Sequence, residues 1–311
     1  MKNRLTRILS VDYPLIQGPM RLLTLGAMAA AVSAAGGFGQ IAASGLTGER
    51  LREEIEKARR LTDRPFGVNI PLHRSNALEA LEIAIEMGIK AITTSGGNPA
   101  RVMDRVGQAG LKVLHKVSTV ALGLKAQAAG VDGVIGMGFE AGGHGGREQI
   151  TTFCLVPQLA DALDVPVVAA GGIGDARGLV AALALGAEGA EMGTRLAATL
   201  ECPAPGYFHE ALLAAGDCGT LVLGQDIMPL RVLRNELSEA LVDPARAGSA
   251  GGLAGGYLEA EGDMEHSIMP AGQAAGLIDR VVSIDELFSE LKNRAGRLAA
   301  GLNDFFKEGA R

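Results

Sequence analysis

The sequence is poor in aromatic residues and contains no tryptophan. Only 4% of its 311 residues are aromatic, which argues against a carbohydrate-stacking cleft or a stacking platform for single-stranded nucleic acid. The chain also lacks a block of basic residues, and its formal net charge is −6. Because phosphate contacts to DNA or RNA need clustered Lys and Arg, we expect no nucleic-acid partner.

Cysteine and histidine are also scarce. The three cysteines, Cys154, Cys202 and Cys218, form no CxxC pair, so the sequence predicts neither a disulfide framework nor a zinc site. The five histidines show no HExxH or HxxxH spacing, and we expect no metal. The basic N-terminus has no apolar core of a signal peptide, which together with the reduced cysteines predicts a cytoplasmic protein.

One stretch, residues 22–48, is free of charge and long enough to span a bilayer. It consists mainly of Ala, Gly and Ser, with glycines at positions 36, 37 and 39. We interpret it as a buried helix followed by a buried strand and expect no membrane contact.

Eight short apolar runs alternate with helical patterns. Hydrophobic residues make up 48% of the chain, enough for a large core, and several of the runs lack the polar alternation of half-exposed strands. Their starts lie mostly 20–30 residues apart, one strand and one helix per unit. This spacing predicts a closed (β/α)₈ TIM barrel; the alternative is an open, doubly wound sheet. The predicted strands are 13–17, 37–42, 66–70, 89–94, 111–117, 131–136, 165–170 and 187–193.

The pattern weakens after the eighth run. We predict a barrel core in residues 1–200, a helical insertion or cap in residues 201–268, and C-terminal helices returning to the barrel in residues 269–311. The insertion contains Pro203, Pro205 and Pro229 and a glycine-rich stretch at 248–256.

Glycine-rich loops follow strands seven and eight. Barrels often bind phosphate between these two loops, where free backbone N–H groups face the ligand. Ala170, Gly171 and Gly172 follow strand seven, and Gly193 and Thr194 follow strand eight. The glycines allow close approach of an anion and the threonine offers a hydroxyl, so we predict a phosphate site here. The alternative is that the glycines only form tight turns.

The loop after strand six is long and places His144 among four glycines. Long loops in compact domains are usually functional, and an imidazole with an unperturbed pKa of about 6.5 suits proton transfer. A purely structural histidine is the alternative. His115 lies within an apolar strand and is interpreted as a core residue. Lys116, on the opposite face of that strand, is either paired to an acid or aimed at an anionic ligand group, and both remain open.

Residues 37–42 match the dinucleotide-binding pattern G-x-G-x-x-A. That fingerprint must follow a strand and open a helix, whereas this segment follows a helical pattern and is itself predicted as a strand. We therefore reject it as a nucleotide site. No G-x-S-x-G motif is present, which leaves covalent hydrolysis without support.

Seven stretches are informative together: YPLIQGPM, RPFGVNIP, VLHKV, GFEAGGHGG, VVAAGGIGDARG, EMGTR and IMPAGQAAGL. In this order they resemble the nitronate monooxygenase (2-nitropropane dioxygenase) family, which includes flavin-dependent enoyl-acyl-carrier-protein reductases and NADH:quinone reductases. The resemblance runs from about residue 3 to residue 308. Only the segment 201–268 matches poorly, and we expect that segment to shape substrate access.

The resemblance implies a barrel that holds one FMN non-covalently, with His144 as the catalytic histidine. By this resemblance, a turn and a returning C-terminal segment lie against the flavin ring, polar residues contact its edge, and the glycine loops hold its phosphate. The implied cofactor-binding residues are Pro19, Met20, Asn69, Lys116, Gly142, Ala170, Gly171, Gly172, Gly193, Thr194, Met269 and Gln273.

The expected activity is oxidation of an alkyl nitronate or nitroalkane with O₂, in which His144 takes the α-proton or orients the nitronate. The alternative is an enoyl-acyl-carrier-protein or quinone reductase at the same FMN site, with NADH or NADPH as co-substrate. A non-catalytic flavin-binding module is a third hypothesis. The partner is in each case a small molecule, and a homodimer is compatible with the sequence.

Overall fold

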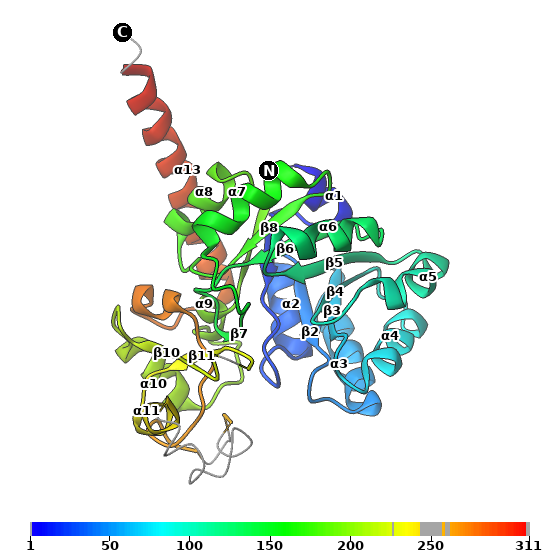
Figure 1. The fold of residues 1–311 in the computed structure, drawn as a ribbon, viewed down its shortest axis with the longest axis horizontal. Coiled ribbons are helices and arrows are strands. Elements are labelled where there is room, and N and C mark those ends of the chain that lie inside the picture. The colour runs from blue at the N-terminus through cyan, green and yellow to red at the C-terminus, as the bar shows by residue number, and fades with distance from the viewer. Residues whose placement is uncertain (1, 226, 243–256, 259–261, 309–311) are drawn as a thin grey trace.

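The computed structural model describes residues 2–225, 227–242, 257–258 and 262–308. Eight parallel strands form one sheet with helices packed outside it, as Figure 1 shows. All eight predicted strands are confirmed. They are β1 (Leu15–Gln17), β2 (Gly39–Ala42), β3 (Phe66–Pro71), β4 (Ala91–Ser95), β5 (Lys112–Val117), β6 (Gly133–Met137), β8 (Val167–Ala170) and β9 (Gly189–Met192).

The sheet closes on itself. Its strand order is β1-β9-β8-β6-β5-β4-β3-β2, and a parallel bridge between Ile16 and Phe38 joins the two end strands. The Phe38 amide donates to the Leu15 carbonyl at 2.8 Å, and the Gln17 amide donates to the Phe38 carbonyl at 3.0 Å. The fold is therefore a (β/α)₈ barrel, and the open, doubly wound alternative is wrong.

Amphipathic helices cover the outer face of the barrel. In α3 the stripe Leu51, Ile55 and Ala58 is buried while the other residues are mostly charged, and the Thr47 side chain caps the first turn by accepting from the Arg50 amide. The helices of this layer are α2 (Gly26–Ala34), α3 (Gly48–Leu61), α4 (Ala77–Glu86), α5 (Ala100–Ala109), α6 (Val120–Ala128), α7 (Thr152–Ala162), α8 (Ala176–Ala184) and the short α9 (Thr194–Ala197).

The uncharged stretch 22–48 contains α2 and β2, as predicted. Both elements are largely buried. None of the helices in the described ranges is both long enough and apolar enough to cross a membrane.

A short helix that the sequence analysis did not predict closes the N-terminal end of the barrel. In α1 (Arg4–Leu9), Leu5 and Leu9 are buried against the inward-facing side chains of the strands. The Asn3 amide group donates to the Glu188 carbonyl at 2.6 Å, which fastens the helix to the start of β9. This end of the barrel is therefore filled, so a ligand must enter from the opposite end.

Residues 201–242 form two helices and two strands. The helices α10 (Gly206–Ala214) and α11 (Glu236–Val242) agree with the predicted helical insertion, but the antiparallel strands β10 (Thr220–Leu223) and β11 (Leu230–Leu233) were not expected. Strand β11 also pairs with β7 (Gly143–His144), which connects this segment to the loop after β6. The glycine-rich stretch 248–256 lies outside the described residues.

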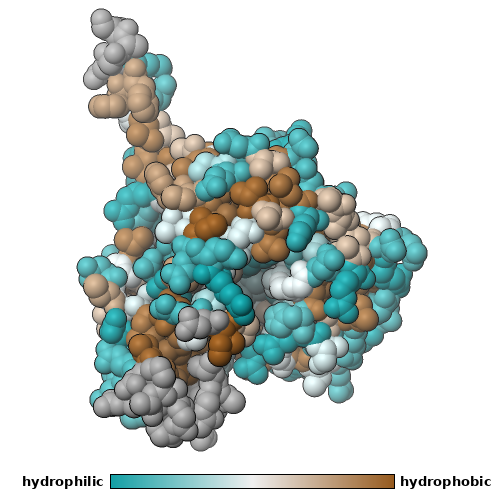
Figure 2. All heavy atoms as spheres, viewed as in Figure 1, coloured by the Kyte–Doolittle hydropathy of each residue, from teal (hydrophilic) through white to brown (hydrophobic). Residues whose placement is uncertain are grey.

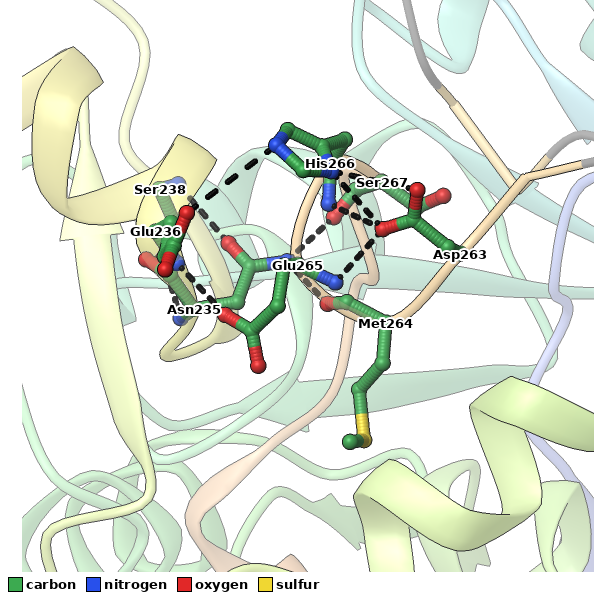
Figure 3. A network of polar contacts seen from close by, with 8 residues as sticks. All are labelled: Asn235, Glu236, Ser238, Asp263, Met264, Glu265, His266 and Ser267. Atoms are coloured by element: carbon green, nitrogen blue, oxygen red, sulfur yellow. Dashed lines mark hydrogen bonds and ion pairs between the residues drawn. The ribbon is translucent and has the colours of Figure 1, made fainter.

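A polar network, drawn in Figure 3, joins α11 to the segment 263–267. The Asn235 side-chain amide donates to the carbonyls of Met264 at 2.8 Å and Ser267 at 2.7 Å. The His266 ring lies 3.0 Å from a carboxylate oxygen of Asp263. The network therefore fixes the point at which the chain returns toward the barrel.

The C-terminal part consists of the 3₁₀ helix η1 (Gln273–Leu277) and the long helix α13 (Ile284–Glu308), both within the segment 269–311. Leu287 and Leu291 of α13 are buried in the core shared with α8. The last turns of α13 project from the molecule, as Figures 1 and 2 show. Phe305 and Phe306 in these turns are exposed. The division of the chain into core, insertion and C-terminal helices stays a prediction.

Candidate active site

The barrel interior becomes polar at the C-terminal ends of the strands. The lower layer is apolar, with Phe38, Leu114 and Ile135 fully buried. Above it, the Asn69 side-chain amide donates to the Thr93 hydroxyl at 2.9 Å, and that hydroxyl donates to the side-chain carbonyl of Gln40. We call this layer, with Gln17, Lys116 and Glu191, the polar floor.

Lys116 and Glu191 form a buried ion pair in the polar floor. The two side chains come from β5 and β9 and are 12% and 5% exposed. Burial raises the pKa of the Glu191 carboxyl, and the Lys116 ammonium opposes that shift. Of the two interpretations left open for Lys116, the structure shows the acid-paired one.

Two polar atoms of the floor have no hydrogen-bond partner. They are the Gln17 side-chain nitrogen Nε2 and the Glu191 oxygen Oε2, and no other buried side-chain nitrogen or oxygen of the described residues is in this state. Leaving a buried donor or acceptor unpaired costs about 1–3 kcal/mol, so such atoms call for an explanation. A donor and an acceptor in neighbouring strands fit a planar, polar molecule lying on the floor.

The glycine loops after β8 and β9 form a cradle at one side of this floor. A Cβ atom added to Gly193 would meet no atom within 4 Å, so open space lies in front of its backbone. Gly171 and Gly172 have φ values of +103° and +72°, a conformation that glycine adopts without strain. The Thr194 hydroxyl accepts from the Gly272 amide at 2.8 Å. The chemistry of these groups fits a phosphate.

Ala170 ends β8 directly before the cradle. Its carbonyl accepts from the Gly138 amide at 2.9 Å and from the Thr152 hydroxyl at 3.2 Å. The side chain is buried. Ala170 therefore holds the start of the cradle in place through its backbone.

The C-terminal segment returns to the loop after β6. A Cβ atom at Gly142 would lie 2.5 Å from the Ala271 backbone, so only glycine allows this approach. The Gln273 amide donates to the Glu140 carbonyl at 2.9 Å. The Gln273 side chain is exposed, whereas Met269 is buried in the core cluster that includes Leu233.

The turn after β1 lies beside the cradle. A Cβ atom at Gly18 would lie 2.9 Å from the Gly193 Cα atom, which shows how closely the two loops approach. Pro19 and Met20 follow and are half-buried. The Met20 amide donates to the Thr24 hydroxyl at 3.1 Å, which fixes the turn.

His144 lies in strand β7 rather than in a free loop. It pairs with Leu230, and the following amide, that of Gly145, donates to the Pro229 carbonyl at 3.0 Å. The side chain is exposed, yet neighbouring atoms displace water and lower its pKa, and the Arg74 guanidinium and the His73 ring lower it further. A hydrogen bond to the Pro229 carbonyl acts in the opposite direction and raises the pKa of His144. The ring is therefore neutral at pH 7 and able to accept a proton.

His115 is a core residue, as predicted. It is buried and its Nδ1 atom lies 2.8 Å from the Thr94 hydroxyl. Burial lowers its pKa to about 4. Two other features that the sequence analysis rejected as functional also lie in structural elements. Residues 39–42 of the G-x-G-x-x-A match form strand β2, and Cys202 is buried. Within the described ranges, no three His, Cys, Asp or Glu side chains are grouped to hold a metal ion.

The sequence analysis missed Gln17, Gln40, Thr93 and Glu191. Each is a polar residue inside a short, otherwise apolar strand, and this contrast is the signal that could have identified them. Glu191 is one example: it lies in the β9 sequence GAEM, and a carboxylate there is costly to bury unless it is paired.

A closed barrel with a polar floor and a glycine cradle after its last two strands is the arrangement in which barrel enzymes often bind the phosphate of a small molecule at the C-terminal face. The chain belongs to the nitronate monooxygenase family, whose profile matches residues 2–293. It is an oxidoreductase, as the family and its relatives are.

Three relatives illustrate the range of the family. A (3aS,4S,5R,7aS)-5-hydroxy-7a-methyl-1-oxo-octahydro-1H-indene-4-carboxyl-CoA dehydrogenase from Mycobacterium tuberculosis is 35% identical, with 79% of this chain and 70% of the relative covered. A probable nitronate monooxygenase from Staphylococcus saprophyticus is 33% identical, covering 76% and 79%. The structure of FabK from Thermotoga maritima matches with a TM-score of 0.92 and 34% identity over 98% of this chain and 99% of that one.

Proposed function

We propose that the protein is an FMN-dependent oxidoreductase in which His144 transfers a proton. The observation that carries the proposal is the polar floor with its two unpartnered atoms, beside a cradle whose Gly193 faces open space. A flavin ring has donors and acceptors along one edge and FMN has a single phosphate, so both features fit the same molecule. FMN supplies the two-electron exchange that the protein itself cannot.

The residues of the chain then have separate tasks. Gly171, Gly172 and Gly193 present backbone N–H groups to the phosphate, and Thr194 adds its hydroxyl. The Gln17 Nε2 atom would donate a hydrogen bond to the flavin ring. Lys116 places a positive charge at the polar floor, where the Glu191 carboxylate holds the Lys116 ammonium in position. Asn69 is oriented by Thr93 and offers a polar contact from β3.

In this proposal His144 accepts the α-proton of a neutral nitroalkane at a ring nitrogen, or orients a nitronate that has already lost that proton. Its lowered pKa keeps the ring in the basic form at neutral pH. Oxidation of an alkyl nitronate with O₂ is the first candidate reaction, supported by the family profile and by relatives named probable nitronate monooxygenase.

Reduction of an enoyl thioester by NADH or NADPH is the second candidate. The observation that favours it is the exposed Arg74, which follows β3 at the mouth of the barrel and whose positive charge lowers the pKa of His144. Such a field suits a phosphorylated substrate better than a small nitronate. The relative named as a carboxyl-CoA dehydrogenase also supports a thioester substrate.

FMN content tests the proposal directly. We expect about one FMN per chain in the purified or reconstituted protein, and a large loss of FMN affinity in Gly193→Ala, because the added methyl group occupies the space of the phosphate. Each lost hydrogen bond to a charged group is worth about 1.5–3 kcal/mol, or roughly tenfold or more in affinity. The measurement is fluorescence titration of FMN with apoprotein, together with a urea denaturation curve.

The matched control is Gly206→Ala. A Cβ atom at Gly206 also meets nothing within 4 Å, but Gly206 lies in α10 and not in the cradle. Both variants should remain folded. Equal FMN affinity in Gly193→Ala and the parent protein would place the phosphate elsewhere.

A further inference from the structure

The loop that carries His144 is rich in glycine. Residues 141–146 read AGGHGG, and a chain of this composition samples many conformations unless neighbouring parts of the fold restrict it. Proton transfer needs the imidazole within hydrogen-bond reach of the substrate, and a displacement of about 1 Å can cost about a hundredfold in rate. The position of His144 therefore depends on contacts from outside the loop.

Strand β11 holds the end of this loop through its backbone. His144 pairs with Leu230, and the neighbouring Gly143 pairs with Arg231. The Gly145 amide donates to the Pro229 carbonyl at 3.0 Å. Figure 1 shows β7 beside β11. His144 therefore takes its place in the molecule from β11, and what fixes β11 to the barrel also fixes His144.

The Arg231 side chain connects β11 to the barrel. Its Nε atom donates to the Phe139 carbonyl at 3.1 Å, and its guanidinium lies 4.9 Å from the centre of the Phe139 ring. Phe139 closely follows β6, and its amide donates to the Ile150 carbonyl at 2.9 Å. The preceding amide, that of Gly138, donates to the Ala170 carbonyl at the end of β8 at 2.9 Å. Arg231 therefore joins β11 to a point that is anchored on the barrel.

The contacts of Arg231 use the planar shape of its guanidinium. A second nitrogen, Nη1, donates to the Thr220 hydroxyl in β10 at 3.1 Å, so one group links β10, β11 and the loop after β6. The Phe139 ring beneath it reaches back to the residue after His144, since a Cβ atom at Gly145 would lie 3.6 Å from a ring carbon. The start and the end of the loop are thus held together.

Arg231 is buried, with 7% of its surface exposed. Burial lowers its pKa, and the nearby Glu140 carboxylate opposes that shift. Among the described residues it forms no ion pair, although a buried charge is costly without compensating contacts. Its contribution therefore comes from the hydrogen bonds and the ring contact that hold the loop.

We propose that Arg231 is the positioning residue that holds His144 in place for proton transfer, by fixing β7 and β11 to the start of the loop after β6. Successive residues of a strand point to opposite faces, so Arg231 lies behind the face that Leu230 shares with His144. It therefore acts through the loop and not by touching the substrate. The proposal rests on the proton-transfer role proposed above for His144.

The test combines Arg231→Met with His144→Ala. Methionine keeps an apolar stem but none of the donors. We expect Arg231→Met to retain FMN, to leave KM little changed and to lower kcat on a neutral nitroalkane about 10–100-fold, with a much smaller loss on the pre-formed nitronate. In a reductase, transfer to the enoyl substrate should slow while flavin reduction by NADH or NADPH persists. In the His144→Ala background, Arg231→Met should cost no more than about twofold, because the group that it positions is already gone.

Arg234→Met is the matched control. Arg234 directly follows β11, and its Nε atom donates to the Cys218 carbonyl at 3.2 Å while Nη1 pairs with Glu239 at 3.0 Å. It should show parental kinetics. If Arg231→Met loses its flavin or its fold, Arg231→Lys takes its place in the comparison. Lysine keeps the charge but lacks the planar fork, so we expect the same selective loss on a smaller scale.

The two proposals fail in different ways. Parental kcat in the Arg231 variant, or the same fold loss with and without the His144 side chain, would overturn the positioning role. If His144→Ala is slow while the Arg231 variant is not, only the positioning role is contradicted. Parental rates in His144→Ala itself contradict the proton-transfer role on which it rests.

Discussion

His144→Ala is expected to retain FMN and to lose about 10²–10⁴-fold in turnover on a neutral nitroalkane, the usual cost of removing a general base. The fold should survive, because β7 pairs with β11 through backbone groups and the side chain is exposed. Activity on the pre-formed nitronate should fall far less, since its α-proton is already gone. Steady-state rates on both substrates measure this difference.

The same variant separates the two candidate reactions. In an enoyl reductase, reduction of the flavin by NADH or NADPH should persist while transfer to the enoyl substrate slows. His266→Ala is the control: His266 is exposed and bonds Asp263 on the surface. Parental rates of His144→Ala on every substrate would show that this histidine is structural.

Lys116→Met is expected to destabilise the protein by about 3–5 kcal/mol at pH 8, because it leaves the Glu191 carboxylate buried and unpaired. Burial already raises the pKa of Glu191, so the folded state holds this proton more tightly than the unfolded state. The variant should therefore be most stable below the ordinary glutamate pKa of about 4.3 and lose stability as the pH rises through the raised value. Urea denaturation at pH 5 and pH 8 measures the difference.

Lys112→Met is the matched control on the same strand, since Lys112 pairs with Asp132 at the surface. Removing that exposed pair should cost about 1 kcal/mol or less. Combining Lys116→Met with Glu191→Leu should recover most of the loss, because both charges are then gone. A Lys116→Met variant as stable at pH 8 as Lys112→Met would contradict the buried ion pair.

The barrel could be predicted because each of its strands is a short apolar run and the runs recur at a regular interval. Parallel strands covered on both faces have this pattern, and a glycine or a capping residue such as Thr47 marks the helix ends. The cradle was predictable for a similar reason, since glycines at the ends of consecutive strands meet at one face of the barrel.

The polar floor was harder to predict because its partners lie far apart in sequence. Lys116 and Glu191 are separated by 75 positions, and only closure of the barrel brings them together. The pairing of His144 with Leu230 depends on β11, whose four residues, LRVL, resemble many segments that are not strands. Local patterns predict elements, but contacts between distant elements depend on the closed fold.

Anaerobic mixing of the FMN-loaded protein with a reductant tests the central claim, that this barrel exchanges electrons between a substrate and bound FMN. We expect the flavin colour to be lost rapidly with an alkyl nitronate, with NADH or with NADPH, and to return when air is admitted. Loss of colour with the nitronate supports the monooxygenase, and loss with a nicotinamide nucleotide supports the reductase. A fully loaded protein whose colour persists with all three would contradict the account.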